Sequence, residues 1–301
     1  MTDQMMHISV CICTYKRPQL LKRLLDDLVV QDTNGLFTYS IAVADNDGLR
    51  SAEAVVSGFA AGSPVPIAYC VEPRQNIALA RNKAVENATG DFIAFIDDDE
   101  FPVKGWLAAL FETCTGNDVD GVLGPVKPFF EEGAPAWVVK GGFYDRADYP
   151  TGFVLDWQKT RTGNVLLKGE MLRAGSPPFR PEFRCSEDQD FFRRMIGDGH
   201  RFIWCSEAVV YEVVPPARWR RTVILRRALL RGTMAALDPT LGPTGIIKSV
   251  GAVVVYAAAL PFSLVIGHHW FMRFLSKLCD HLGKLLGLLG ANPIKESYVT
   301  E

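Results

Sequence analysis

The chain has 301 residues, a hydrophobic content of 48% and a formal net charge of −2 at pH 7. This length predicts two domains, or one domain with an appendage, and the nearly neutral charge argues against binding to nucleic acid. Seven scattered cysteines without a C-x-x-C spacing argue against a disulfide framework and a zinc site, and they indicate a reduced, cytoplasmic compartment. Residues 1–7 are polar, so no signal peptide is expected.

Strands and helices alternate in the first hundred residues. The predicted segments are strands at 7–14, 39–44, 67–71 and 92–96, with helices that begin near Pro18 and that cover roughly 52–61 and 76–87. Such alternation is typical of a parallel sheet with right-handed crossovers, so the expected fold class is α/β. The sequence has no G-x-G-x-x-G and no G-K-S/T loop, which argues against a dinucleotide fold and a P-loop ATPase.

Three adjacent carboxylates, Asp97, Asp98 and Asp99, follow the strand predicted at 92–96. Ligands of open α/β sheets bind at the carboxyl ends of strands, and a cation offsets the repulsion between neighbouring acids. Alternate side chains of an extended segment point the same way, so Asp97 and Asp99 are expected to bind one ion. Carboxylates without His or Cys nearby favour Mg²⁺ or Mn²⁺. The alternative is a solvated acidic turn or a helix N-cap.

Six motifs occur in the order in which one enzyme family has them. They are VCICTYKRP, VADND, PRQNIALARN, FIDDDE, TGNVLL at 162–167 and SEDQDFFRR at 186–194. With these motifs, residues 7–211 resemble the family 2 inverting glycosyltransferases of the GT-A fold. The resemblance implies a mixed, mostly parallel sheet flanked by helices. It also implies a catalytic domain at 1–214, with a nucleotide-sugar-binding half at 7–102 and an acceptor half at 103–214.

The resemblance implies donor-binding roles for residues in the first half of the chain. The first loop would line the nucleoside pocket, the base edge would donate to an aspartate, and the acids after the strand would bind the diphosphate through a metal. The implied residues are Thr14, Tyr15, Arg17, Asp45, Asn76, Arg81, Asp97 and Asp98, with Asp99 and Asp97 as metal ligands. From the residues alone, Arg17 could be a solvated loop residue, Asp45 an Asx-turn residue and Arg81 an exposed helical charge.

Inversion by direct displacement requires a carboxylate that removes the proton of the acceptor hydroxyl. In the family, the aspartate of a Glu-Asp pair has this role, so the resemblance implies Asp188 as the general base, with Glu187 beside it. Asp190 is a competitor for the role. All three acids could instead form the charged first turn of a helix.

Three residues are expected to contact the acceptor or a diphosphate, namely Asn164, Trp157 and Arg227. An aromatic ring such as Trp157 could stack on a sugar, although packing beneath a loop is commoner. Arg227 belongs to the arginine-rich segment 218–231, which could bind the donor diphosphate, a lipid diphosphate or anionic headgroups, or form a solvated helix face. The sequence PPARW lacks the Gln of the Q-x-x-R-W motif of processive synthases, so transfer of a single sugar is favoured.

The C-terminal region, 215–301, is predicted to be a helical, membrane-associated appendage. Residues 249–267 carry no charge and are just long enough to cross a bilayer, with Pro261 expected to break the middle. Residues 270–289 have an amphipathic pattern that suits a helix in the membrane interface. A re-entrant or monotopic anchor is favoured over a true span, and a buried helical hairpin in a soluble dimer is the alternative.

Over its whole length, the chain resembles the bacterial exopolysaccharide glycosyltransferases of the succinoglycan type. That resemblance implies transfer of one hexose, most simply glucose from UDP-glucose, to a polyprenyl-diphosphate-linked oligosaccharide. It also implies Mn²⁺ or Mg²⁺ as cofactor and a location at the cytoplasmic face of the bacterial inner membrane. Lipopolysaccharide or a protein glycan is the alternative acceptor. A nucleotidyltransferase and a catalytically silent sugar-binding protein are the rivals from other classes.

Overall fold

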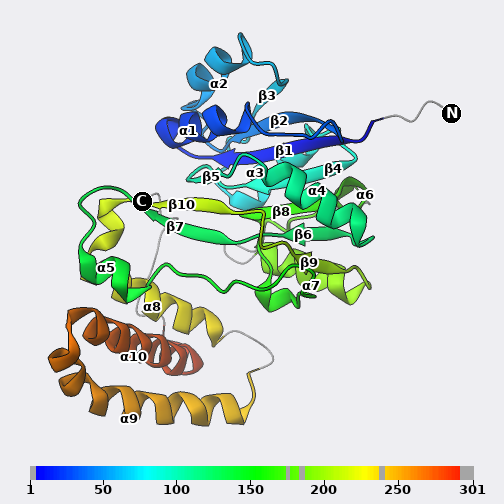
Figure 1. Ribbon diagram of the computed structural model, residues 1–301. Helices are drawn as coiled ribbons and strands as arrows, with labels where there is room; N and C mark the ends of the chain where they lie inside the picture. The colour runs from blue at the N-terminus through cyan, green and yellow to red at the C-terminus, as the bar shows by residue number, and fades with distance from the viewer. Residues whose placement is uncertain (1–4, 174–176, 183–186, 237–240, 292–301) are drawn as a thin grey trace. The chain divides into compact units, whose positions relative to one another are not determined.

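The computed structural model describes residues 5–173, 177–182, 187–236 and 241–291 (Figure 1). It contains two compact units, which consist of residues 1–127 with 146–212 and of residues 128–145 with 213–301. The sequence predicted a single domain boundary at residue 214. It did not predict that residues 128–145 belong to the second unit. This membership rests on a small core formed by Val138, Tyr144, Val214 and Ile224, which are distant in sequence.

The first unit is built on a seven-stranded sheet with the order β3-β2-β1-β4-β8-β6-β9 (Figure 1). The strands are β1 (His7–Thr14), β2 (Thr38–Asp45), β3 (Ile67–Val71), β4 (Phe92–Ile96), β6 (Gly121–Leu123), β8 (Asn164–Lys168) and β9 (Phe202–Trp204). The first four pair in parallel, whereas β8 is antiparallel to both β4 and β6. The mixed, mostly parallel sheet predicted for the chain is therefore confirmed.

Helices cover both faces of this sheet. They are α1 (Pro18–Leu28), α2 (Glu53–Ala60), α3 (Ile77–Glu86), α4 (Trp106–Gly116), α6 (Gly169–Arg173) and α7 (Glu187–Gly197), with a 3₁₀ turn, η1 (Trp157–Lys159). Successive residues of β1 face opposite sides of the sheet. Val10 packs in the core that includes residues of α1, α2 and α4, whereas Cys11 packs in the core that includes residues of α3, α6 and α7. Both faces of β1 are thus buried, which explains why residues 8–13 are apolar except for Ser9.

A small sheet brings two distant acidic residues together. Its order is β5-β10-β7, from β5 (Glu100–Pro102), β10 (Val210–Val214) and β7 (Val126–Phe130). In the antiparallel register of β5 and β10, Glu212 lies opposite Glu100. The short strand that follows the three aspartates is therefore fixed by a partner more than a hundred residues away.

The second unit is helical. Its elements are α5 (Ala136–Gly141), η2 (Pro216–Trp219), α8 (Arg221–Ala235), α9 (Pro243–Ile266) and α10 (His268–Leu288). Helices α8 and α10 approach so closely that a Cβ on Gly232 would lie 2.1 Å from the carbonyl oxygen of Asp280, and one on Gly283 would lie 2.2 Å from that of Leu229. Only glycine fits at both positions, so these two residues set the packing distance.

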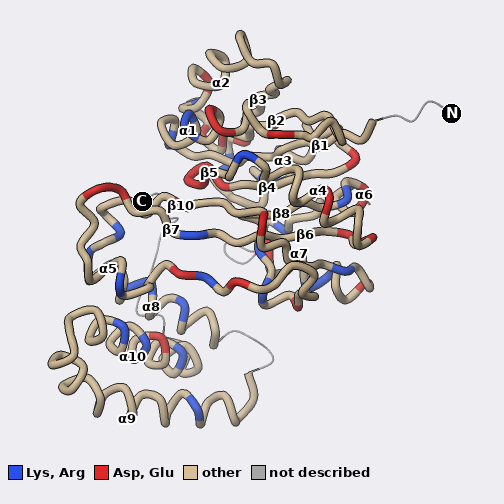
Figure 2. Tube along the Cα trace, viewed as in Figure 1, with Lys and Arg blue, Asp and Glu red and all other residues tan. Residues whose placement is uncertain are grey.

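Helix α9 runs through Pro261 without interruption, so the expected break at this residue is wrong. A proline removes one backbone hydrogen bond, a loss that long apolar helices tolerate. Among the described residues, α9 is the helix that is long and apolar enough to cross a membrane. Only 11% of its most apolar stretch is buried. Lys248 is its one charged residue, and the rest of the helix is uncharged in Figure 2.

Candidate active site

The carboxyl ends of β1 and β4 bring together the first loop and the aspartates. Thr14 donates its hydroxyl to Oδ2 of Asp98 at 2.7 Å, and Nη1 of Arg17 donates to Oδ1 of Asp98 at 3.2 Å and to Oδ2 of Asp99 at 3.3 Å. Burial raises the pKa of Asp98, although Arg17 and Thr14 oppose that shift. Arg17 is thus an ion-pairing residue of this edge, and the interpretation as a solvated loop residue is wrong.

The three aspartates lie in a turn, closed by the bond from the amide of Glu100 to the carbonyl of Asp97 at 3.1 Å, so the expectation of an extended segment is wrong. The side chain of Asp97 is 44% exposed and that of Asp99 is 12% exposed, whereas that of Asp98 is 7% exposed. No cluster of three or more His, Cys, Asp or Glu side chains suited to a metal occurs in the described part of the chain. Two carboxylates fit a hard ion such as Mg²⁺ that takes its other ligands from water and from substrate phosphates.

Asp45 is fully buried at the end of β2 and organises the loop that follows. One carboxylate oxygen accepts from the amide of Asp47 at 3.0 Å, and the other accepts from the amide of Ala52 at 2.8 Å and from the Tyr69 hydroxyl at 2.9 Å. These bonds match the Asx-turn alternative. A carboxylate has about four acceptor positions, so contact with a base stays a prediction. Tyr15, half-buried after β1, has the Lys16 ammonium 5.0 Å from its ring centroid.

Asn76 begins helix α3. Its side-chain oxygen accepts from the amides of Ala78 at 2.9 Å and Leu79 at 3.2 Å, and its amide group donates to the carbonyl of Pro181 at 2.9 Å. Asn76 is therefore an N-cap that satisfies two otherwise unpaired helix donors. Its predicted contact with the donor remains a prediction.

Arg81 links the aspartate segment to the Glu-Asp pair. Its side chain is 9% exposed and forms an ion pair with Glu187, while Nη2 lies 3.7 Å from Oδ1 of Asp97. Burial acts against its charge, but Glu187 and Asp97 outweigh burial and raise the pKa of Arg81. The interpretation of Arg81 as an exposed helical charge is therefore wrong, and one guanidinium holds the two acidic segments at one place.

The acids at the start of α7 lie in three different environments. Glu187 is buried against Arg81, and burial raises its pKa although Arg81 lowers it. Asp190 is 4% exposed and lies within 3.0 Å of Nε of Arg194. Its carboxylate also pairs with the guanidinium groups of Arg193 at 3.5 Å and Arg180 at 3.7 Å. Asp188 is the partly exposed member. Ser186, the first residue of this motif, lies outside the described residues.

Four residues of this region were not singled out as site residues from the sequence, namely Glu100, Arg146, Arg161 and Glu212. Arg146 forms an ion pair with Glu212. Glu100 accepts from the amide of Asp97 at 3.1 Å, while its Oε1 has no hydrogen-bond partner among the described residues. Burial raises the pKa of Glu100 well above its usual value, and Asp97 and Asp99 add to this. Burial and the nearby Arg146 lower the pKa of Arg161 to about 10.

Steric contacts explain why Gly163 of the TGNVLL motif is a glycine. A Cβ on Gly163 would lie 3.0 Å from Oε1 of Glu100 and 3.1 Å from Oδ2 of Asp97. Any larger side chain would push into these carboxylates. The motif therefore contains a glycine because its backbone lies close to Asp97 and Glu100, which the sequence alone does not show.

The comparisons with known proteins agree with this geometry. Residues 9–168 match the model of "Glycosyl transferase family 2". The chain is also 32% identical to a succinoglycan biosynthesis protein, ExoM, of Rhizobium meliloti (strain 1021), over 98% of this chain and 97% of that protein. The chain belongs to glycosyl transferase family 2. It is therefore a glycosyltransferase, and the nucleotidyltransferase rival is not supported.

Solved structures confirm the GT-A fold of this glycosyltransferase. A mannosyltransferase from Pyrobaculum calidifontis in complex with GDP-Man and Mn²⁺ is 18% identical, with a TM-score of 0.58 over 92% of this chain and 86% of that chain. TarS of S. aureus in complex with UDP-GlcNAc is 15% identical, with a TM-score of 0.55 over 96% and 93%. At these identities the likeness establishes the fold.

The three residues predicted to contact the acceptor have different positions in the glycosyltransferase. Asn164 is fully buried, accepts from the Trp106 indole at 2.7 Å, and donates to the carbonyls of Pro125 at 3.1 Å and Ala208 at 2.7 Å. Its whole side chain is engaged, so it fixes the strand ends and has no face for an acceptor.

Trp157 and Arg227 occupy different units. Trp157, in η1, is half-buried and packs against the core that contains Phe191. Arg227 belongs to the second unit, where its guanidinium lies 5.2 Å from the Tyr144 ring centroid. Their contacts with an acceptor or a diphosphate stay predictions.

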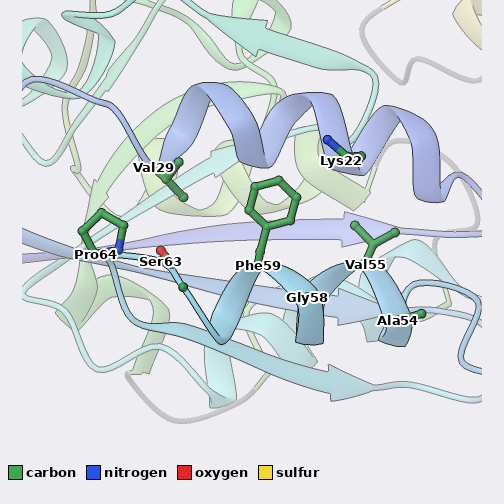
Figure 3. Close-up of a pocket in the computed structure, with 9 residues that line it drawn as sticks. Lys22, Val29, Ala54, Val55, Gly58, Phe59, Ser63 and Pro64 are labelled. Carbon is green, nitrogen blue, oxygen red and sulfur yellow. The ribbon is translucent and has the colours of Figure 1, made fainter.

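An apolar cavity of about 530 Å³ lies between α1 and α2 (Figure 3). It is lined by Val29, Val55, Phe59 and Pro64, with Lys22 among them. The Lys22 ammonium lies 5.5 Å from the centroid of the Phe59 ring. Its lining residues include none of the acids at the ends of β1 and β4, so this cavity is separate from the candidate active site.

Proposed function

We propose that this glycosyltransferase moves one hexose from a UDP-sugar, most simply UDP-glucose, to a polyprenyl-diphosphate-linked oligosaccharide in bacterial exopolysaccharide biosynthesis. The observation that carries this function is the Arg81 contact with both Glu187 and Asp97. It brings the segment expected to hold the diphosphate and the segment expected to hold the base to one position. The similarity to a succinoglycan biosynthesis protein supports the biosynthetic context.

The donor occupies the edge formed by β1 and β4. Asp97 and Asp99 would hold Mn²⁺ or Mg²⁺, which when bound supplies positive charge to the departing diphosphate. Arg17 binds Asp98 and Asp99, so it orders this segment before the donor arrives. Thr14 binds the second carboxylate oxygen of Asp98. Asp97 is the most exposed of the three carboxylates.

Asp188 is the general base. The acceptor oxygen bonds to the anomeric carbon while the bond from that carbon to the diphosphate oxygen breaks, and UDP leaves with the bonding electrons. The hydroxyl proton passes to a carboxylate oxygen of Asp188. Attack opposite the leaving group inverts the anomeric centre, so an α-linked donor gives a β linkage. Asp190 is less suited to this role because three arginines surround its buried carboxylate.

The donor half of this function is tested by incubating the purified full chain with a panel of nucleotide sugars. The protein is expected to release UDP slowly from its own donor when Mn²⁺ or Mg²⁺ is present, and to show no release in metal-free buffer. A thermal-shift measurement with the same panel identifies the donor as the compound that raises Tm most. The proposed function would be contradicted if UDP release and Tm were the same with every nucleotide sugar, whether or not metal is present.

The second unit anchors the enzyme to the cytoplasmic face of the inner membrane. Val254 and Val255 of α9 are 64% and 63% exposed, although an apolar residue gains by leaving water. Arg221 and Arg226 of α8 are exposed as well, and such cations attract anionic headgroups. An anchor of this kind would bring the enzyme to a lipid-linked acceptor, whereas the nucleotide sugar is supplied from the cytosol.

Co-sedimentation with anionic lipid vesicles tests the anchor. The double variant Val254→Lys/Val255→Lys is expected to remain in the supernatant, because a lysine at the centre of a bilayer costs roughly 2.5–3.5 kcal/mol. Val30→Lys is the matched control, since Val30 is 57% exposed in the first unit. Full sedimentation of the double variant, or no sedimentation of the unchanged protein, would contradict the anchor.

A further inference from the structure

Arg161 lies at the same edge of the sheet as the three aspartates. In the antiparallel pairing of β4 and β8, Ile96 lies opposite Asn164, so the residues that leave β4 and those that enter β8 are neighbours. Gly163 confirms this, because its backbone approaches Asp97 closely enough that a Cβ would lie 3.1 Å from Oδ2. Arg161, two residues before Gly163, therefore lies in the loop that leads into β8 at this edge.

The charge of Arg161 differs from that of its neighbours in having no direct partner. Arg17, Arg81 and Arg146 each form an ion pair with a carboxylate of this region. Arg161 forms no hydrogen bond or ion pair with any residue that the structure describes. Arg161 is only partly exposed, so its charge has lost some hydration without a direct ion pair. A partly buried cation in this state favours an incoming anion.

The electrostatic neighbours of Arg161 indicate which substrate supplies that anion. Its charge interacts most with those of Arg146 and Glu100, and also with those of Asp188 and Glu212. Arg17 is the cation that binds Asp98 and Asp99 on the donor side. The neighbours of Arg161 include Asp188, the proposed base, but none of the three aspartates, and the substrate that meets the base is the acceptor.

We propose that Arg161 binds a negatively charged group of the acceptor, a phosphate or a carboxylate, beside the hydroxyl that Asp188 deprotonates. The planar guanidinium forms two parallel hydrogen bonds with either group. This role rests on the proposed function for its substrate, although anion binding can be measured without turnover. An acceptor linked to a lipid diphosphate supplies a phosphate, and an acidic sugar of the glycan supplies a carboxylate.

Two anions distinguish these sources. The full chain, saturated with UDP and Mg²⁺ to fill the donor edge, is titrated with inorganic phosphate or with glucuronate at constant ionic strength, and the Kd is taken from the rise in Tm. Glucose is the neutral control. We expect Arg161→Gln to raise the Kd of at least one anion by roughly 10- to 100-fold, because a bond to a charged group is lost.

The affinity for UDP separates this role from a donor role. It is measured in the same variant and is expected to stay within about twofold, because Arg17 binds the donor segment. Lys159→Gln is the matched control, since Lys159 is a cation of the same segment that pairs with Asp156. The control is expected to leave both affinities unchanged.

Equal anion affinities in the unchanged protein and in Arg161→Gln would overturn the role of Arg161, as would failure of the unchanged protein to bind either anion. A UDP affinity that falls by the same factor would assign Arg161 to the donor instead.

Arg161→Lys, which keeps the charge but loses the planar fork, is expected to raise the anion Kd by about threefold to tenfold. If Arg161→Gln does not fold, Arg161→Lys provides the test. An anion Kd that is unchanged in Arg161→Lys would overturn the role of Arg161. Failure of the unchanged protein to bind UDP contradicts the proposed function, and the anion titrations still report on Arg161.

Discussion

Two acidic runs, 97–99 and 187–190, resemble each other in sequence and differ in their surroundings. In the first run, the most buried member, Asp98, is held by Thr14 and Arg17, and its neighbours are more exposed. In the second run, Asp190 is the buried member and is surrounded by arginines, whereas Asp188 is partly exposed. Each run thus contains one acid that serves the structure and at least one acid that solvent can reach.

The difference teaches that position within a run decides the role of an acid. The first run forms a turn after a strand, in which Asp98 and Asp99 both bind Arg17 while Asp97 lies near Arg81. The second run begins a helix, where residues two apart point in different directions, so Asp188 and Asp190 are separated. Arg81 joins the two runs through Asp97 and Glu187. Substitutions at matched positions therefore test whether the two kinds of acid behave differently.

The largest effect is expected from Asp99→Ala. Loss of a metal ligand removes several kcal/mol of stabilisation from the transition state, so UDP release and sugar transfer should both fall by roughly 10³-fold or more. The measurement is UDP release in the presence of Mn²⁺. Asp26→Ala is the control, since Asp26 is an exposed acid paired with Lys22 on α1. Metal-dependent UDP release that survives in Asp99→Ala would contradict the metal role of the first run.

Asp188→Asn is expected to lower transfer to a lipid-linked acceptor by roughly 10²–10⁴-fold, the usual contribution of a general base. UDP binding should be unchanged, since the donor edge remains intact. Rates of transfer are measured beside the Kd of UDP, with Asp198→Asn, an exposed acid just beyond α7, as the control. Full transfer by Asp188→Asn would show that another group is the base.

Asp190→Asn tests the structural member of the second run. Removal of its charge leaves the ion pair with Arg194 and the longer ones with Arg180 and Arg193 unformed. The expected loss is about 1–3 kcal/mol in the free energy of unfolding, reduced from the value of a fully buried pair because the arginines reach solvent. Urea unfolding followed by tryptophan fluorescence measures it. A folded variant that transfers sugar 10²-fold more slowly would make Asp190, and not Asp188, the base.

Thr14→Val is expected to have the smallest effect, because Asp98 keeps its bond from Arg17. Loss of the 2.7 Å hydrogen bond should lower the free energy of unfolding by about 1 kcal/mol. Thr162→Val is the matched control, since the buried Thr162 hydroxyl has no hydrogen-bond partner among the described residues. Its replacement should leave stability unchanged or raise it. Equal losses in the two variants would mean that the Thr14 bond contributes nothing specific.

Local patterns predicted most of the first half of the fold. The strands expected at 7–14 and 92–96 have those bounds, and the helix expected at 76–87 spans Ile77–Glu86. These elements follow from apolar periodicity and from caps such as Asn76, which act over a few residues.

Features that depend on distant pairing were not predictable in this way. The sequence does not reveal that Asn164 is enclosed by Trp106 and Ala208, or that Glu212 lies opposite Glu100. It also left Asp190 as a competitor of Asp188 for the role of base, because the sequence does not show that Arg180, which lies before α7, pairs with Asp190. The membership of 128–145 in the second unit depends likewise on contacts with residues after 213.

The measurement that tests the central claim most directly is a crystal structure of the protein with UDP and Mn²⁺, with the manganese located by its anomalous scattering. The claim predicts one manganese ion bound by the carboxylates of Asp97 and Asp99 and by the diphosphate of UDP. Manganese bound away from both aspartates, or UDP bound away from the ends of β1 and β4, would contradict it.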